Sequence, residues 1–210
     1  MKVVHLVLSD AFAGIEQHVD ELLSNKLNDK PILICNNSIA DFFDKSISIY
    51  KIKNLGRRSL YGKYKLKKLL NKINPDIVHT HGSKTSSIIS SINTNQFKHV
   101  ATVHGIKKNK KVYEKADFII GVSQKTIYGL KNNVAVVSNW WSPSLNKFDN
   151  KKNEYALAVG RLEKVKGFDL LINSWTNINT KLVIIGSGKE KNTLINMINV
   201  KGLREKVTII

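Results

Sequence analysis

The sequence predicts an α/β protein with one complete parallel-sheet domain followed by the first half of a second. Two observations predict the class. Short runs of Val, Ile and Leu alternate with segments of helical period along the whole chain. These apolar runs are continuous, as is typical of parallel strands that are covered on both faces. A third observation divides the chain, because a polar stretch with a proline at residues 142–153 interrupts the alternation once.

The first domain is expected to span residues 1–141. A strand at residues 3–8 leads into a helix on which Ile15, Val19 and Leu23 share a face. A second, amphipathic helix is expected at residues 61–73. The other expected strands are 31–35, 47–52, 76–79, 100–103, 117–122 and 134–137, and the other helices are 84–92 and 124–130.

The second domain is expected at residues 154–210, after a linker at 142–153. Its strands are predicted at 155–159, 181–185 and 207–210, and its helices at 168–175 and 190–200. A doubly wound sheet typically has about six strands, so these strands supply about half of one. The strand at 155–159 would then form an open apolar edge. We therefore expect a C-terminally truncated domain; a compact three-stranded subdomain packed on the first domain is the alternative.

Composition is that of a soluble globular protein, with 42% hydrophobic and 24% charged residues. The net charge of +18 favours an anionic partner, such as a membrane surface, a phosphorylated substrate or nucleic acid. Part of this excess of lysine fits the codon bias of an AT-rich genome. With the single cysteine Cys35, no signal peptide pattern and no long apolar run, a cytoplasmic protein is expected.

Positive charge is concentrated in two stretches. Residues 51–72 contain no Asp or Glu, and residues 107–115 carry further lysines. Such stretches can bind anionic lipid headgroups, at about 1 kcal/mol per cation near the surface. A solvated face is the alternative. No nucleic-acid motif accompanies them, so no nucleic-acid partner is expected. The cations of the first stretch are Lys51, Lys53, Arg57, Arg58, Lys63, Lys65, Lys67, Lys68 and Lys72.

Candidate site residues of the first domain follow its strands. Gly14 precedes the first helix, where backbone N–H groups can meet an anion, although the G-x-G-x-x-G pattern is absent and a plain turn is the alternative. His79 and His81 end one strand, and His104 ends the next, at the edge where open α/β sheets bind ligands. The spacing of His79 and His81 would suit a metal, but no cluster of carboxylates or cysteines completes a tetrahedral site, so no metal is expected.

Candidate residues of the second domain follow its first two strands. Arg161 offers a guanidinium fork for phosphate oxygens, and Lys166 adds a point charge just before a helix. Gly186 and Gly188 allow a tight turn near a ligand. Solvated surface cations and an ordinary turn are the alternatives.

The order of these segments resembles the retaining, GT-B-fold glycosyltransferases of family 4, over essentially the whole chain. The most specific stretch is residues 160–172. The similar segments are AGIEQHV (13–19), DIVHTHG (76–82), TVHG (102–105), ADFIIGVS (116–123), VGRLEKVKGFDLLI (159–172) and LVIIGSG (182–188).

The resemblance implies two Rossmann-like domains, the acceptor side at 1–141 and the nucleotide-sugar side at 154–210. It implies a nucleotide-diphosphate sugar as donor, bound in the cleft between the domains, with no further cofactor and no metal. His104 would be catalytic, contacting the donor sugar near the reacting carbon. Gly14 would approach the donor phosphates or sugar, and Arg161 and Lys166 would bind the diphosphate. The acceptor would be a glycan or a lipid-linked glycan of bacterial surface polysaccharide or lipopolysaccharide synthesis, and the basic stretches would hold the protein on the inner face of the cytoplasmic membrane.

Two departures from the family pattern qualify the resemblance. Asn139 is followed by Trp140 and Trp141, where family members usually carry Asn-Gly. The family's E-x7-E region, whose glutamates hold the donor ribose and sugar, would lie beyond residue 210, so impaired transfer is expected. The alternatives are a catalytically inactive remnant that binds sugars or anions, or a subunit completed by a partner chain. A basic nucleic-acid binder is disfavoured by the order of the motifs.

Overall fold

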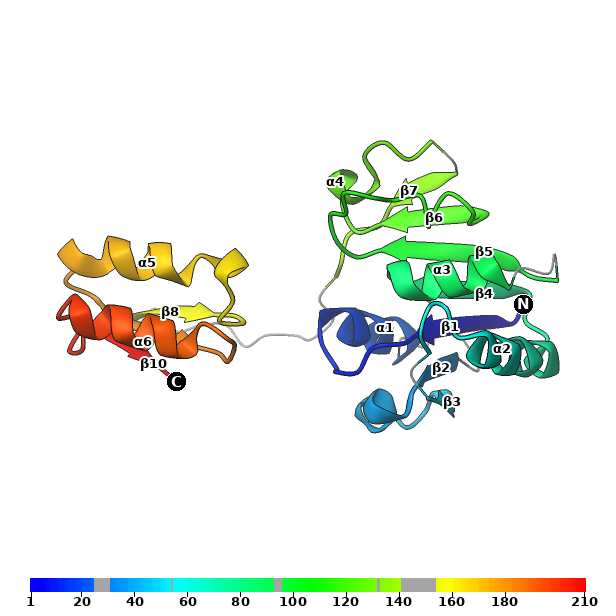
Figure 1. Cartoon of the computed structure of the whole chain (residues 1–210), viewed down its shortest axis with the longest axis horizontal. Helices are drawn as coiled ribbons and strands as arrows, with labels where there is room; N and C mark the ends of the chain where they lie inside the picture. Colours follow the sequence, from blue (N-terminus) through cyan, green and yellow to red (C-terminus); the bar gives the residue numbers. More distant parts are fainter. Residues whose placement is uncertain (25–30, 54, 93–95, 132, 141–153) are drawn as a thin grey trace. The chain divides into compact units, whose positions relative to one another are not determined.

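A computed structural model describes residues 1–24, 31–53, 55–92, 96–131, 133–140 and 154–210. The chain divides into two compact units, Met1–Ser144 and Leu145–Ile210. The linker expected at residues 142–153 lies outside the described residues. Each unit is described by itself (Figure 1).

The first unit is built on a parallel, seven-stranded sheet with the order β3-β2-β1-β4-β5-β6-β7. The chain starts in the middle of the sheet, builds outward to β3 and returns to place β4 beside β1, as in doubly wound folds. The strands are β1 (Val3–Val7), β2 (Ile32–Asn36), β3 (Ser48–Ile52), β4 (Ile77–His81), β5 (Lys98–Val103), β6 (Phe118–Gly121) and β7 (Val134–Val136).

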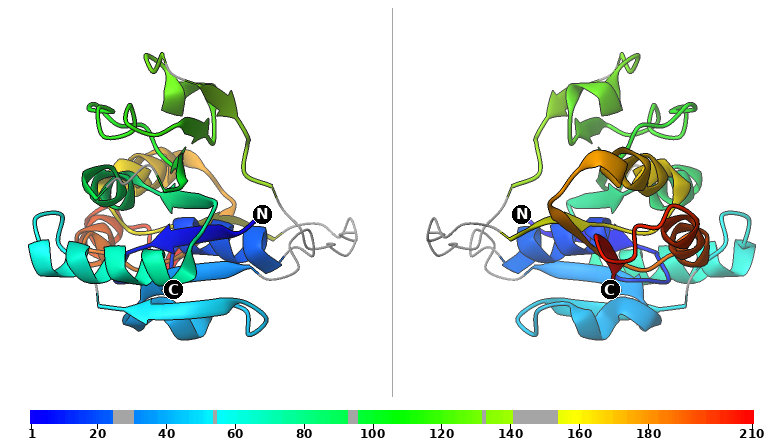
Figure 2. Two further views of the ribbon diagram at one scale, coloured as in Figure 1. Left: turned by 90° about the vertical axis from the view of Figure 1, so that its right-hand side faces the viewer. Right: turned by 90° about the vertical axis from the view of Figure 1, so that its left-hand side faces the viewer.

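Helices cover both faces of this sheet (Figure 2). On one face, α2 (Leu60–Ile73) and α3 (Ser83–Ser91) pack on Val4 and Leu6 of β1. On the other face, α1 (Gly14–Ser24) packs on Val7. Successive side chains of a strand point to opposite faces, so the odd-numbered residues of β1 face α1. His5 therefore lies on the α1 face, and the register pairs it with His79 of β4.

The second unit has a parallel, three-stranded sheet with the order β10-β9-β8. Its core joins the sheet to two helices through residues such as Leu162, Ile172 and Ile184. On the opposite face, Tyr155, Leu157 and Val159 of the edge strand are at least half exposed. The elements are β8 (Tyr155–Val159), α5 (Phe168–Ser174), β9 (Lys181–Ile185), α6 (Lys191–Val200) and β10 (Val207–Ile209).

These sheets confirm the predicted fold class, and the expected strands and helices are all present with small shifts at their ends. The helix expected at 124–130 is shorter, because α4 (Gln124–Ile127) ends before a turn that contains Gly129. Three 3₁₀ helices were not predicted: Asn37–Phe42, Lys164–Lys166 and Trp175–Asn177. Within the described part of the chain, none of the helices combines the length and apolar character that a membrane span requires.

Candidate functional site

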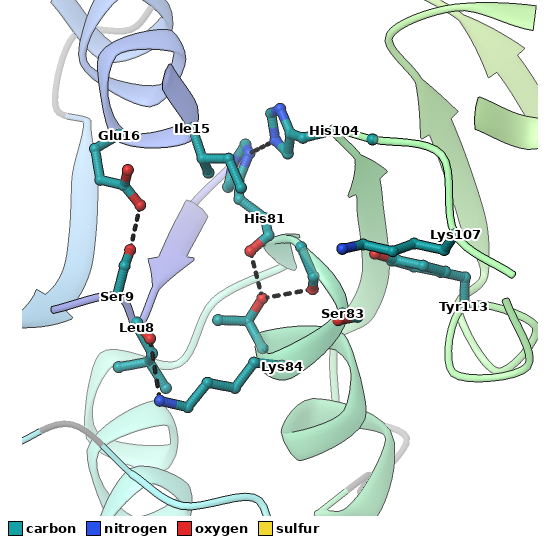
Figure 3. Close-up of a pocket in the computed structure, with 13 residues that line it drawn as sticks. Leu8, Ser9, Ile15, Glu16, His81, Ser83, Lys84, His104, Lys107 and Tyr113 are labelled. Atoms are coloured by element: carbon teal, nitrogen blue, oxygen red, sulfur yellow. Dashed lines mark hydrogen bonds between the residues drawn. The ribbon is translucent and has the colours of Figure 1, made fainter. Parts of the chain in front are cut away.

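The first unit has a cavity of about 290 Å³ at the carboxyl ends of its central strands (Figure 3). It lies where the chain leaves β1, β4 and β5, which is where ligands of open α/β sheets bind. The lining residues are Leu8, Ser9, Ile15, Glu16, His81, Gly82, Ser83, Lys84, Thr85, His104, Gly105, Lys107 and Tyr113.

Glu16 shapes the turn between β1 and α1. Its carboxylate accepts hydrogen bonds from the Ser9 hydroxyl and from the backbone N–H of Ala13, the latter at 2.9 Å. The second contact is the half of a capping box in which an acid in the first helical turn reaches back to the cap. Only 3% of Glu16 is exposed, so its carboxyl group is held in place at the edge of the cavity.

Gly14 begins α1 beside this turn but does not line the cavity itself. A Cβ atom at this position would meet no heavy atom within 4 Å. Packing within the first unit therefore gives no reason for a glycine here. The open space beside Gly14 is compatible with a bound ligand. The role of Gly14 in binding the donor stays a prediction.

Three imidazoles form a hydrogen-bonded chain that ends in the cavity. Nδ1 of His5 is 3.1 Å from Nε2 of His81, and Nδ1 of His81 is 3.1 Å from Nε2 of His104. Figure 3 shows the last of these contacts. A neutral imidazole has one donor and one acceptor nitrogen, so the tautomer of one ring dictates that of the next. His81 therefore determines whether Nε2 of His104 donates or accepts.

Burial keeps these rings neutral. It lowers the pKa of His5 to about 4, with the nearby His18 adding to the effect, and lowers the pKa of His104 to about 4 for the same reasons. Burial also lowers the pKa of His81 well below its usual value, and the neighbouring imidazoles add to this. At neutral pH His104 is thus a hydrogen-bonding group without a charge.

The remaining candidates of the first unit lie around this chain. His79 does not reach the cavity: its Nε2 is 2.7 Å from the Thr102 hydroxyl in the core. His18 of α1 contacts His104 with ring centroids 4.9 Å apart, and Trp140 packs on His18 at the same distance. Asn139 is exposed beside Trp140. Sequence reasoning did not identify His5, His18 or Glu16 as members of the site.

Cations line the side of the cavity away from the imidazoles. Nζ of Lys84 donates to the Leu8 carbonyl at 3.2 Å, and burial lowers its pKa. Lys107 also lines the cavity. Arg57 donates to the Ser83 hydroxyl at 3.1 Å, at the first residue of α3. The lining of the cavity thus combines neutral imidazoles, the carboxyl group of Glu16 and positively charged lysines.

In the second unit, Arg161 and Lys166 are exposed on the segment that follows β8. Arg161 pairs with Glu163 at 2.8 Å. An exposed pair of this kind typically contributes no more than about 1 kcal/mol, so it holds the guanidinium only weakly. Lys166 closes the short helix Lys164–Lys166, directly before α5.

Gly186 and Gly188 hold the segments after β8 and β9 against each other. A Cβ atom at Gly186 would lie 1.9 Å from the Gly160 carbonyl oxygen, and one at Gly188 would lie 2.3 Å from that of Leu162. The backbones are joined directly, since the N–H of Leu162 donates to the Ser187 carbonyl at 2.8 Å. These glycines therefore serve a close backbone approach, which fixes the segment that carries Arg161.

The fold and the position of the cavity define a GT-B-type protein, and solved structures support that class. The lipopolysaccharide outer core galactosyltransferase WaaB is 20% identical, with a TM-score of 0.70 over 100% of this chain and 67% of its own. HepE from Anabaena, solved with UDP-glucose, is 15% identical, with a TM-score of 0.81 over 100% of this chain and 68% of its own. Identities this low show the fold alone.

The chain belongs to glycosyltransferase family 4. The model of Glycosyltransferase Family 4 matches residues 12–142, and the model of Glycosyl transferases group 1 matches residues 144–210. The family resemblance noted in the sequence is thereby confirmed.

Two curated relatives are similar over part of the chain. The amylovoran biosynthesis glycosyltransferase AmsD of Erwinia amylovora is 40% identical over 94 residues, which is 40% of this chain and 26% of that protein. An N-acetylgalactosaminyltransferase of Campylobacter jejuni, named for a diphospho-undecaprenol-linked acceptor, is 29% identical over 147 residues, or 61% of this chain and 40% of that protein. The matches thus span less than half of either relative.

Proposed function

We propose that this chain serves a retaining transfer of a sugar from a nucleotide-diphosphate sugar to a glycan or lipid-linked acceptor, in bacterial surface polysaccharide or lipopolysaccharide synthesis. Membership of family 4 is the observation that carries this proposal. The names of the relatives support the pathway class, since one acts in amylovoran biosynthesis and another on a diphospho-undecaprenol-linked sugar. Neither name fixes the sugar that this chain would transfer.

In this proposal Arg161 and Lys166 bind the diphosphate of the donor. Transfer breaks the bond between the anomeric carbon and a phosphate oxygen, and negative charge grows on the leaving diphosphate. Cations positioned for that charge stabilise the transition state more than the ground state. The weak pairing of Arg161 with Glu163 supports the assignment, because the fork can turn to a phosphate at little cost.

His104 would contact the donor sugar, and Gly14 would leave space for the donor beside α1. Support for His104 comes from its position at the cavity and from its neutral state, which suits a hydrogen bond to a sugar hydroxyl. His81 would hold the His104 ring in one orientation. His79 lies in the core, so in this proposal it stabilises the fold and does not contact the donor.

An anionic membrane surface is the proposed location of the reaction, on the cytoplasmic side where nucleotide sugars are available. The exposed side of α2 carries Leu60, Tyr61 and Tyr64 among lysines. Nζ of Lys65 lies 4.5 Å from the centroid of the Tyr61 ring. Aromatic and aliphatic side chains among lysines are the composition of helices that lie in the headgroup region of a bilayer.

Calorimetry with UDP, GDP and ADP tests the diphosphate site. We expect one of them to bind, and Arg161→Ala to weaken binding about tenfold to a hundredfold through the loss of charge-assisted hydrogen bonds. Lys166→Ala should weaken it less, because lysine acts as a point charge. Lys164→Ala, in the same short helix, is the matched control and should bind like the original protein.

Absence of binding to a well-folded chain, or equal losses in all three variants, would contradict the assignment of Arg161 and Lys166. Binding without transfer to any acceptor would instead support the alternative, in which the chain is an inactive sugar- or anion-binding remnant or is completed by a partner.

A further inference from the structure

Three histidines beside the cavity, on α1, at the end of β4 and after β5, have the geometry of a metal site. Among the described residues, His18, His81 and His104 each offer a ring nitrogen within 4.8 Å of the other two. The closest pair, Nδ1 of His81 and Nε2 of His104, is 3.1 Å apart. Ligands of a tetrahedral zinc ion lie roughly 3.3 Å from one another when each Zn–N bond is about 2.0–2.1 Å. The ring nitrogen of His18, within 4.8 Å of the other two, would need to move closer to complete that arrangement.

We propose that His18, His81 and His104 bind a divalent transition-metal ion, with zinc as the best-suited metal. Three imidazoles provide the ligand set, and two of them, His81 and His104, also line the cavity. No metal was expected from the sequence, because no carboxylate or cysteine cluster accompanied His79 and His81 there. In the folded chain, His18 of α1 and His104, which follows β5, lie close to His81.

A second set of three histidines is a weaker candidate. His5, His79 and His81 also bring their nitrogens within 4.8 Å of one another. All three are buried, however, and Nε2 of His79 is engaged with Thr102. Of this set only His81 lines the cavity, whereas the first set lines it with both His81 and His104.

His5 would not bind the ion itself but would accept a hydrogen bond from the ligand His81. When Nδ1 of His81 binds the ion, its Nε2–H can donate to Nδ1 of His5, at the observed separation of 3.1 Å. Metal-binding histidines almost always donate their other ring N–H in this way, which orients the ring.

Charges around the cavity affect the strength of the site. Glu16 favours a cation, whereas Lys84 and Lys107 disfavour one. We therefore expect binding weaker than at a structural zinc site. If His104 also contacts the donor sugar, as the proposed function holds, a bound ion would occupy the same imidazole and oppose transfer.

Cobalt provides a spectroscopic test that does not depend on transfer. The full chain, without an affinity tag and stripped with a chelator, is titrated with Co²⁺ while visible absorption is recorded. We expect intense bands of tetrahedral Co²⁺ that saturate at one equivalent and disappear when Zn²⁺ is added. His18→Gln and His104→Gln should each weaken binding by at least tenfold.

His99→Gln is the matched control, because His99 belongs to neither set and contacts Thr80. It should bind Co²⁺ like the original protein, with circular dichroism confirming that each variant is folded. The proposal is overturned if the original protein shows no tetrahedral bands, if His18→Gln and His104→Gln bind as tightly as the original, or if His99→Gln loses binding equally. Because no nucleotide is present, failure here is distinct from failure of the diphosphate site.

Discussion

At the scale of single residues, the molecule differs from an ordinary doubly wound domain in the polarity of one face of its sheet. His5, His79 and His81 lie where such sheets usually carry Val, Ile or Leu. Each of these rings makes a contact with another polar side chain, so the buried polar groups are satisfied rather than isolated. The face can therefore be polar and still contribute to a stable core.

His81 is the residue on which this arrangement depends. Replacing it by Phe removes both of its hydrogen bonds while the ring volume is nearly kept, so the tautomer of His104 is no longer imposed. We expect ¹⁵N NMR of the imidazoles to show one dominant tautomer of His104 in the original protein and a mixture in His81→Phe. His81 acts here as a positioning residue.

The matching control is His99→Gln, which leaves the contact between His81 and His104 in place and should leave the His104 spectrum unchanged. Nucleotide affinity, which we assign to the second unit, should not change in either variant. A His104 tautomer that is the same in His81→Phe as in the original protein would argue against the hydrogen-bonded chain.

The sequence predicted where this site lies, but it did not identify all of the histidines that form it. His81 and His104 were expected because they end strands, and strand ends are visible in the sequence as the ends of apolar runs. His5 lies inside such a run, and His18 lies on a helix face that reads as amphipathic. Their contact with His81 and His104 depends on strand register and helix packing, which no local pattern reveals.

At the scale of elements, α2 has one apolar side that is buried and one basic side that is exposed. Leu66, Leu70 and Ile73 pack into the core, and its other side is basic with exposed aromatic residues. The sequence predicted this helix well, because its period is regular and Ser59 caps it by accepting from the N–H of Gly62. The turns were harder to predict, since the 3₁₀ helix Asn37–Phe42 has no extended period.

A charge reversal on α2 tests the proposed contact with a membrane. Lys67 and Lys68 are exposed, and each cation near an anionic bilayer contributes about 1 kcal/mol. Lys67→Glu with Lys68→Glu should therefore weaken sedimentation with phosphatidylglycerol-containing vesicles by at least about tenfold. Binding by the original protein should fall as salt is raised, because salt screens exposed charges.

Lys191→Glu with Lys201→Glu, on or next to α6, makes the same change in net charge and serves as the control. Vesicles of phosphatidylcholine alone should bind neither protein strongly. Equal losses for both pairs would mean that net charge, rather than α2, determines the binding.

At the scale of the whole molecule, the two units differ in how they should respond to acid. All six histidines of the chain lie in the first unit. Burial lowers the pKa of His5, His99 and His104 to about 4, whereas the unfolded chain has its usual value of 6.5. Between these values the unfolded state binds more protons, so the contribution of these groups is fully present above about pH 6.5 and declines as the pH falls toward 4.

Calorimetric unfolding of the full chain at pH 7.5 and pH 5 checks this expectation. The transition of the first unit should move down by at least about 5 °C. The transition of the second unit should change much less, because all six histidines lie in the first unit. A parallel shift of both transitions would contradict a histidine origin.

The joined backbones after β8 and β9 have a consequence for binding. Ligand-binding loops usually lose conformational entropy when they close on a ligand, and that loss reduces affinity. Here the segment from Gly160 to Leu162 is already held by the carbonyl of Ser187 and by the close approach of Gly186. Its backbone has little freedom left to lose, so only the side chains of Arg161 and Lys166 would need to become ordered around a diphosphate.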